Sequence, residues 1–350
     1  MVKRLSMSAL LALVLALPTT TAGASKDQTT DWTLNLYLEN DLFSNTDEGY
    51  TNGVRASWVS PDVTDYLDDE TLPGWIRSIN QRLTFFHKTR EGLQRNVTFS
   101  LGQTLYTPRD LERTDLIEDD RPYAGWLFVS LGYQTRTDLQ LDTLETRFGV
   151  VGPAALGQQA QDLVHDLRGF KKFQGWDNQL ANEPGVMFIW EHKRKMRPVY
   201  YDNSRFGFDV IGHSGIALGN VATYVNFGAE VRLGWSIPDD FGTAALRPGG
   251  DNSAPYSVWD PSRKGRRQWG VHAFASVDTQ LVGRDIFLDG NSFTDSHSVN
   301  KKYIVAEGAL GISFIYGGTK ISYATIFRSK EYDLQPNYHT YGSIAFSYTF

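Results

Sequence analysis

The side chains best suited to chemistry in this sequence lie in one short helical stretch. From Ala154 to Arg168, His165 lines up with Gln158, Gln161 and Asp162 at steps of three or four residues, which places them on one face of a helix. A histidine has an ordinary pKa of about 6.5, so it is mostly neutral and still basic at pH 7 and can serve as a general base. A lone histidine is more often a solvated surface residue, and the interpretation depends on the groups beside it.

Three polar runs could supply those groups. They are Glu39-Asn40-Asp41, Tyr50-Thr51-Asn52-Gly53, and the run of two aspartates, Arg, Pro, Tyr, Ala and Gly that extends from Asp119 to Trp126. Each run is a common turn composition and is weak support by itself. Together they contain carboxylates, amides and an arginine, which would form a site if the fold brings them to the histidine.

The elements that must position these groups are β-strands. Apolar and polar side chains alternate with a period of two along most of the chain, and helical periodicity is nearly absent. We count about twelve segments with lengths near the ~9–11 residues that a tilted strand needs to cross a membrane, which predicts an all-β transmembrane antiparallel barrel. The segments are residues 32–40, 50–60, 95–106, 124–136, 139–152, 184–199, 204–219, 222–236, 268–282, 302–316, 318–330 and 339–350.

The N-terminus has the pattern of a secretory signal peptide. Two basic residues precede an apolar run from Leu10 to Leu17, and Ala22-Gly23-Ala24 forms a cleavage site. We predict that residues 1–24 are removed and that residues 25–350 form one outer-membrane barrel domain.

The composition agrees with a barrel in a bacterial outer membrane. The chain holds 9 Trp, 17 Tyr and 20 Phe among 350 residues, and its mean hydropathy is −0.35. A barrel reaches such a value because polar residues facing the lumen offset apolar residues facing lipid. The last strand ends on Phe350, which resembles the assembly signal of outer-membrane barrels. The alternative fold is a soluble β-sandwich. That fold does not account for the export signal, the even number of strands and the excess of aromatic residues occurring together.

Charge and cysteine content exclude several classes of function. The sequence contains no Cys, which excludes disulfide frameworks, cysteine-ligated zinc, iron–sulfur clusters and thiol nucleophiles. The net charge is −6, which argues against electrostatic binding of nucleic acid. The sequence has no Gly-x-Ser-x-Gly motif, which disfavours a serine lipase without excluding it.

Strand order assigns each connection to one side of the membrane. An even number of strands places both termini in the periplasm, so the helix and the three polar runs share the extracellular rim. The extracellular connections are about residues 41–49, 107–123, 153–183, 220–221, 283–301 and 331–338. The periplasmic connections 61–94 and 237–267 are unusually long for a barrel, and we expect a short helix between Leu72 and Phe86.

The rim helix also has an apolar stripe, and it ends at Gly169. We expect this stripe to rest against the wall or the lipid while the imidazole of His165 faces a cleft. The apolar stripe consists of Leu156, Ala160, Leu163, Val164 and Leu167.

Seven short motifs follow one another in the first half of the chain. They are Leu38-Glu-Asn-Asp41, Tyr50-Thr-Asn-Gly53, Leu105-Tyr-Thr-Pro108, Asp120-Arg-Pro-Tyr-Ala-Gly125, Gly149-Val-Val-Gly-Pro153, the helix with His165, and Gly175-Trp-Asp-Asn-Gln179. In this order they resemble the lipid A 3′-O-deacylase family of outer-membrane barrels. The resemblance covers residues 32–185, and beyond them it rests on the strand pattern and the C-terminal Phe.

This resemblance implies a twelve-stranded barrel with an active site between the wall and an extracellular-loop helix, near the outer leaflet. The implied reaction is calcium-dependent hydrolysis of an ester of lipid A, the membrane anchor of lipopolysaccharide. A histidine activates water and Ca²⁺ polarises the ester carbonyl. We expect the protein to be a monomer.

The family's functional residues can be carried over by position. The resemblance places the histidine at His165, the Asn-Asp pair of the first strand at Asn40 and Asp41, the Thr of the second strand at Thr51, and a loop Lys near Arg113. All five are therefore candidate catalytic residues.

One position departs from the family pattern. An acidic residue just past the histidine is replaced by Lys171, and three nearby acidic residues could stand in for it. These are Asp166, Asp177 and Glu183.

The metal ligands are predicted from the acidic run at the end of the first strand. Oxygen donors suit a hard cation, so we expect Asp41, with Asn40 and Glu39, to hold calcium. Two other functions compete with a lipid A deacylase. A passive outer-membrane channel needs no histidine-bearing helix, and an outer-membrane phospholipase would share the geometry but act on another lipid.

Overall fold

The structure is a computed structural model. It describes residues 31–41, 49–63, 66, 69–70, 72–82, 93–201, 204–242, 262 and 268–350. The predicted signal peptide and residues 42–48 of the first extracellular connection lie outside the described residues.

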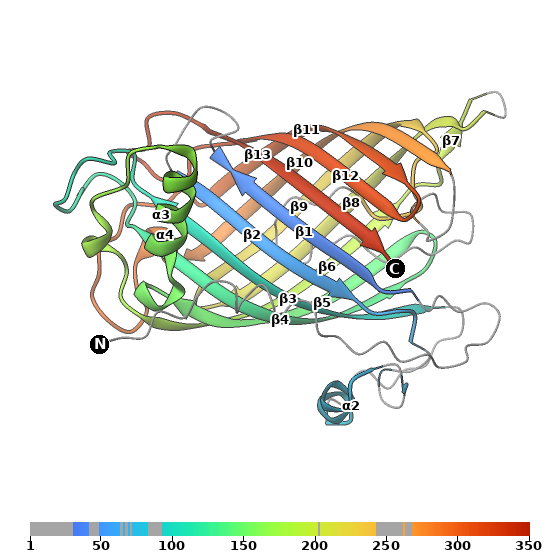
Figure 1. Cartoon of the computed structure of the whole chain (residues 1–350), viewed down its shortest axis with the longest axis horizontal. Helices are drawn as coiled ribbons and strands as arrows, with labels where there is room; N and C mark the ends of the chain where they lie inside the picture. Colours follow the sequence, from blue (N-terminus) through green and yellow to red (C-terminus); the bar gives the residue numbers. More distant parts are fainter. Residues whose placement is uncertain are drawn as a thin grey trace.

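The chain forms a closed antiparallel barrel of twelve strands (Figure 1), as the sequence predicts. β1 pairs with β2 on one side and with β13 on the other, which closes the ring, and β6 pairs directly with β8. The two-residue β7 only extends the edge of β8. The strands are β1 (Thr33–Asn40), β2 (Gly49–Val59), β3 (Gln94–Thr107), β4 (Ala124–Arg136), β5 (Gln140–Val151), β6 (Glu183–Lys195), β7 (Val199–Tyr200), β8 (Phe206–Gly219), β9 (Ala222–Trp235), β10 (Trp269–Asp285), β11 (Ile304–Tyr316), β12 (Thr319–Arg328) and β13 (His339–Thr349).

Helices lie at both ends of the barrel. α3 (Gly157–Arg168), preceded by the 3₁₀ turn η3 (Pro153–Ala155), forms the predicted rim helix. It lies at the same end as α4 (Ile286–Asp289), whereas α2 (Gly74–Asn80) lies outside the wall near the opposite end (Figure 1). A further 3₁₀ turn, η4, spans Trp176–Asn178. Among the described residues, no helix has the length and apolarity to cross a membrane.

Alternation along the strands separates a lipid face from a lumen face. On β1 the side chains of Asn35, Tyr37 and Glu39 are buried, whereas Leu36 and Leu38 are exposed. Exposed leucines on the outer face of a closed barrel are placed for contact with lipid. The same outward belt continues around the wall through Val54, Phe99, Val129, Phe148, Phe188, Val225, Val277, Leu310 and Tyr323.

Paired charges fill the lumen. Near β2 and β5, Glu145 accepts hydrogen bonds from Arg55 at 2.9 Å and from Arg147 at 2.8 Å, and all three side chains are buried. Buried charges are tolerated when each is paired and hydrogen-bonded. This part of the lumen is therefore a packed polar core.

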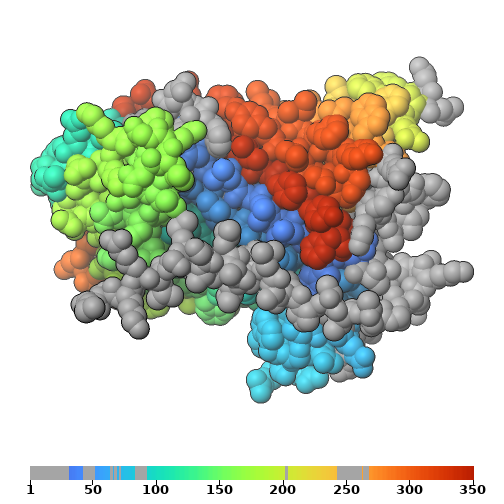
Figure 2. Space-filling model, viewed as in Figure 1, coloured from blue at the N-terminus to red at the C-terminus, as the bar shows by residue number. Residues whose placement is uncertain are grey.

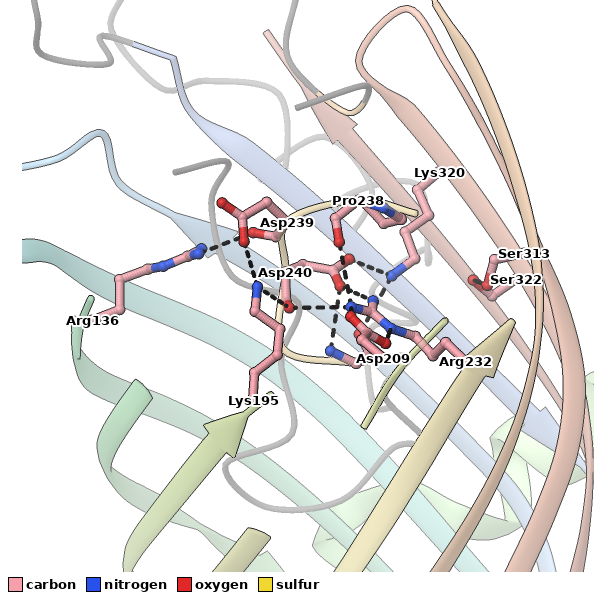
Figure 3. Close-up of polar contacts among 11 residues, drawn as sticks. Arg136, Lys195, Asp209, Arg232, Pro238, Asp239, Asp240, Ser313, Lys320 and Ser322 are labelled. Atoms are coloured by element: carbon pink, nitrogen blue, oxygen red, sulfur yellow. Dashed lines mark hydrogen bonds and ion pairs between the residues drawn. The ribbon is translucent and has the colours of Figure 1, made fainter. Parts of the chain in front are cut away.

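The start of the connection between β9 and β10, up to residue 242, turns into the barrel (Figure 3). Asp240 accepts from Lys320 at 2.6 Å and also from Arg232, whose guanidinium holds Asp209 at 2.6 Å. Asp239 pairs with Lys195, and its backbone carbonyl accepts from Arg136 at 2.9 Å. This acidic turn thus ties together cations from four strands.

Phe241 continues this inward turn. Its ring packs with Leu141 and Ile211, and the charged groups of Arg136 and Lys195 both lie 4.9 Å from the ring centroid. Residues 239–241 therefore occupy the lumen at the end of the barrel opposite α3.

Asp240→Ala is expected to destabilise the barrel by about 3–5 kcal/mol, because it leaves two buried cations without their shared carboxylate. Burial alone would raise the pKa of Asp240, but Lys320 and Arg232 outweigh burial and hold it well below its usual value. The stabilisation is therefore complete at neutral pH and is lost only in strong acid. Urea unfolding in lipid vesicles measures the free energy of unfolding.

Asp239→Ala is the matched control for this substitution. The Asp239 side chain is 31% exposed, and partly exposed ion pairs contribute less to stability. Equal losses for the two variants would contradict the assignment of Asp240 as the central carboxylate.

Candidate active site

The candidate site lies on the outer face of the wall. Asn40 at the end of β1 pairs in register with Asn52 of β2, and both continue the phase of the lipid-facing residues Leu38 and Val54. They are nonetheless buried, with exposed fractions of 7% and 6%. The outer wall is therefore covered at this end of the barrel.

α3 covers the neighbouring part of the same face. Gln103 of β3 donates to the carbonyl oxygen of Ala155 at 2.6 Å, immediately before α3 begins. Gly157 of α3 and Gly125 of β4 allow the helix to approach the strand closely. A Cβ atom on Gly125 would lie only 3.1 Å from the Gly157 backbone. In the space-filling view, α3 and its loop form a mass at one end of the molecule beside the surface of β1 and β2 (Figure 2).

The burial pattern of α3 shows how the helix is turned. Its buried residues are Gly157, Gln161 and His165, and His165 is fully buried rather than solvated. Leu167 of the apolar stripe is 79% exposed. The middle of the stripe, Ala160, Leu163 and Val164, is half-buried.

Hydrogen bonds define the tautomer of His165. Its Nδ1 contacts the backbone carbonyl oxygen of Lys171, and because a carbonyl can only accept, Nδ1 carries the proton and donates it. In the neutral ring Nε2 is then an acceptor, and it lies 3.0 Å from Nε2 of Gln161, whose amide donates. The basic lone pair of His165 is therefore on Nε2.

Aromatic rings hold this imidazole and its loop. The ring centroids of Phe170 and Phe173 lie 6.0 Å and 5.7 Å from that of His165, both in edge-on arrangements. Phe173 also packs edge-on against Tyr123, which joins the loop after α3 to the start of β4. Gly169 ends the helix in a left-handed conformation (φ 71°), as predicted, and turns the chain back toward His165.

Lys171, which replaces the acidic residue of the family, acts through its backbone. Its Nζ is exposed and forms an ion pair with Glu112 at 2.5 Å, while its carbonyl oxygen accepts from His165. The hydrogen bond that the Lys171 amine donates to Glu112 raises the pKa of that amine. In this chain a carbonyl oxygen therefore orients the histidine.

Two of the three residues proposed to stand in for that acidic residue, Asp166 and Glu183, have other partners. Asp166 pairs with Lys172 at 2.8 Å on the exposed side of α3. Glu183 is buried at the start of β6 and accepts from the Ser292 backbone at 2.7 Å. Asp177 is exposed in η4.

Arg113 is paired with a neighbouring carboxylate. Its guanidinium forms a fork with exposed Asp115, with Nη2 2.6 Å from Oδ2, and this hydrogen bond lowers the pKa of the Asp115 carboxyl. A role for Arg113 in catalysis would require it to leave this pair.

The predicted metal ligands separate onto two faces of the wall. Glu39 faces the lumen, where its Oε1 accepts from Ser343 at 3.1 Å, whereas Asn40 faces outward. Asp41 follows β1 directly and is fully buried. Glu39 and Asn40 therefore point to opposite faces of the wall.

Thr51 lies in a β-bulge, where β2 changes register against β3 between Tyr50 and Asn52. Its side chain is outside the described part of the structure. The backbone places Thr51 one residue from Asn52, the partner of Asn40.

The remaining oxygen donors fit a hard cation in type. Asn40 and Asp41 supply buried amide and carboxylate oxygens, which calcium prefers. Within the described residues, no three or more His, Cys, Asp and Glu side chains form a group able to hold a metal. Other ligands would come from carbonyl oxygens and water.

Gln161 is the residue that sequence reasoning left without a role. The structure gives it one, because its amide reaches the basic nitrogen of His165 while it is itself buried. The signal was its spacing of four residues from His165 on the same helix face.

Comparison with known proteins agrees with the fold and the motifs. The family model described as "Outer membrane protein LpxR" matches residues 7–350. LpxR from Salmonella typhimurium aligns with a TM-score of 0.70 and 17% identity, covering 91% of this chain and 100% of that chain. The β domain of the Bordetella autotransporter BrkA aligns with a TM-score of 0.43 and 10% identity over 92% of this chain and 100% of that one. Among curated protein sequences, none matches significantly.

Proposed function

Because this chain belongs to the LpxR family of outer-membrane proteins, we propose that it removes the ester-linked acyl group at the 3′ position of lipid A. The observation that carries this proposal is His165, which is fully buried on the helix that packs on the outer face of the wall, with its basic Nε2 held by Gln161. A site outside the lumen is placed for a substrate in the surrounding membrane. The seven sequence motifs support the choice of lipid A.

Hydrolysis needs a base, and His165 supplies it. Nε2 takes a proton from water as the water oxygen attacks the acyl carbonyl, and the imidazolium then returns that proton to the departing 3′ oxygen. The Nδ1–H bond to the Lys171 carbonyl holds the ring and stabilises its positive charge during the reaction. In the structure the Gln161 amide is hydrogen-bonded to Nε2. The attacking water must therefore replace this amide as the partner of Nε2.

Asn40 and Asp41 would hold the calcium ion, which when bound polarises the ester carbonyl. Both residues are buried beside the covered face of β1 and β2, and this burial favours electrostatic interactions by excluding water. Asn52 lies opposite Asn40 and adds a further amide to the same patch.

The outward apolar side of α3 suits a lipid substrate. Leu167 is largely exposed, and Leu156 and Phe170 are about half exposed on the same segment. Acyl chains in the outer leaflet can lie along this side while the ester enters between helix and wall. All these groups come from one chain, so we propose that the monomer is active.

An outer-membrane phospholipase would use the same groups on a different lipid, and one assay separates the two. Purified protein is expected to release fatty acid from lipid A in mixed micelles with calcium, and to leave phosphatidylethanolamine intact under the same conditions. Release from the phospholipid alone would overturn the proposed substrate. A passive channel is disfavoured by the turn of residues 239–241 inside the lumen.

A further inference from the structure

The short helix on the periplasmic side has no part in the site described above. α2 belongs to the long connection between β2 and β3 and packs against the outside of the wall (Figure 1). Its Ile76 joins Leu72 and Tyr66 in a buried cluster with Val97 of β3 and Tyr133 of β4. Val97 and Tyr133 share the outward phase of the lipid-facing belt.

Buried hydrogen bonds fix α2 in this position. Asn80 is fully buried at the end of the helix, donates to the Tyr66 carbonyl at 2.5 Å and accepts from the hydroxyl of Tyr133. Tyr66 in turn donates to the backbone carbonyl of Gln134 at 2.5 Å. The rings of Tyr66 and Tyr133 also meet edge-on, 5.3 Å apart. α2 is therefore docked firmly against the wall.

The exposed side of α2 continues the lipid-facing belt. Trp75 is 53% exposed and meets Phe99 edge-on, with ring centroids 6.5 Å apart. Phe99 is itself a belt residue on β3. An exposed tryptophan at the edge of such a belt is typical of the membrane–water interface, where its ring contacts acyl chains and its N–H contacts water and headgroups.

The charges on α2 complement phosphate. Residues 74–80 contain Arg77 and no acidic residue, and exposed Arg82 follows directly. Two acidic residues, Asp69 and Glu70, precede the helix in the sequence. Cations beside an interfacial tryptophan favour the headgroup region of a phospholipid layer.

We propose that α2 is an interfacial anchor that binds phospholipid of the inner leaflet of the outer membrane. Trp75 enters the boundary between headgroups and acyl chains beside Phe99, and Arg77 and Arg82 contact the phosphates. The continuity of Trp75 with the belt through Phe99 selects lipid, because a soluble periplasmic partner would not extend onto a membrane-embedded side chain. This anchor would fix the depth of the barrel, independently of what the extracellular site does.

The test uses the full chain in vesicles of phosphatidylethanolamine and phosphatidylglycerol. The difference in emission between wild type and Trp75→Phe isolates Trp75 among the nine tryptophans. We expect this emission to lose most of its intensity with lipids brominated near the headgroup, and to change little with aqueous iodide. Trp126→Phe is the matched control, since Trp126 is buried in the lumen and should respond to neither quencher.

Strong quenching of Trp75 by iodide without quenching by brominated lipid would overturn the proposal, because it would place α2 in the aqueous periplasm. Phenylalanine preserves an aromatic contact with Phe99, so the variant keeps the packing of α2. Heat-modifiable gel migration verifies that both variants form the barrel.

Discussion

His165→Ala is expected to fold and insert normally and to release acyl groups from lipid A about 10²–10⁴-fold more slowly than wild type, the usual effect of losing a general base. The side chain is fully buried, with Nδ1–H donated to the Lys171 carbonyl oxygen and Nε2 facing Gln161. Alanine removes the only group we assign to proton transfer. Fatty-acid release by purified protein in mixed micelles measures the rate.

His192→Ala is the matched control for this variant. His192 lies on β6 and pairs with Asp142 at 2.9 Å, in a partly exposed position on another part of the wall. Its activity should equal that of wild type. A His165→Ala barrel with wild-type activity would rule out His165 as the base.

Removal of calcium is expected to abolish activity, and calcium should restore it where zinc alone does not, because oxygen donors favour a hard cation. Asp41→Asn should weaken the response to calcium, since Asp41 is the buried carboxylate of the proposed ligand pair. Activity titrated with calcium in chelator buffers measures both effects.

Glu39→Gln tests whether Glu39, two residues before Asp41, contributes to calcium binding. Glu39 faces the lumen and accepts from Ser343, a bond that glutamine can also accept. This variant should keep the calcium response of wild type. Full activity in excess chelator, or equal effects of Glu39→Gln and Asp41→Asn, would contradict the proposed metal site.

The barrel could be predicted closely because it depends on short-range rules. The period of two sets which face each strand residue occupies, and an even strand count fixes which connections share a rim. The same alternation places Glu39 on the lumen side of β1, as the structure shows. Its neighbour in sequence, Asn40, therefore faces the other side of the wall.

The orientation of α3 could not be predicted from amphipathicity alone. In a protein surrounded by water the apolar stripe turns inward, but a helix outside a membrane barrel has lipid on its outer side. Leu167 is therefore exposed, and Gln161 and His165 on another side of the helix are buried. The surroundings of the helix decide its orientation.

Two further features depend on contacts between distant segments. The carbonyl oxygen of Lys171 orients His165, and a backbone group leaves no trace in residue type. The turn with Asp239 and Asp240 lies in the lumen because it forms ion pairs there with Lys195, Arg232 and Lys320, which belong to three different strands. Sequence analysis found this connection long but could not place it.

Mass spectrometry of lipid A from cells that produce either the wild-type protein or His165→Ala tests the central claim most directly. The account predicts that wild type yields lipid A lighter by the whole ester-linked acyl group at the 3′ position, and that the variant yields unmodified lipid A at an equal level of inserted barrel. Lipid A of the same mass in both strains, either unmodified or deacylated, would contradict it.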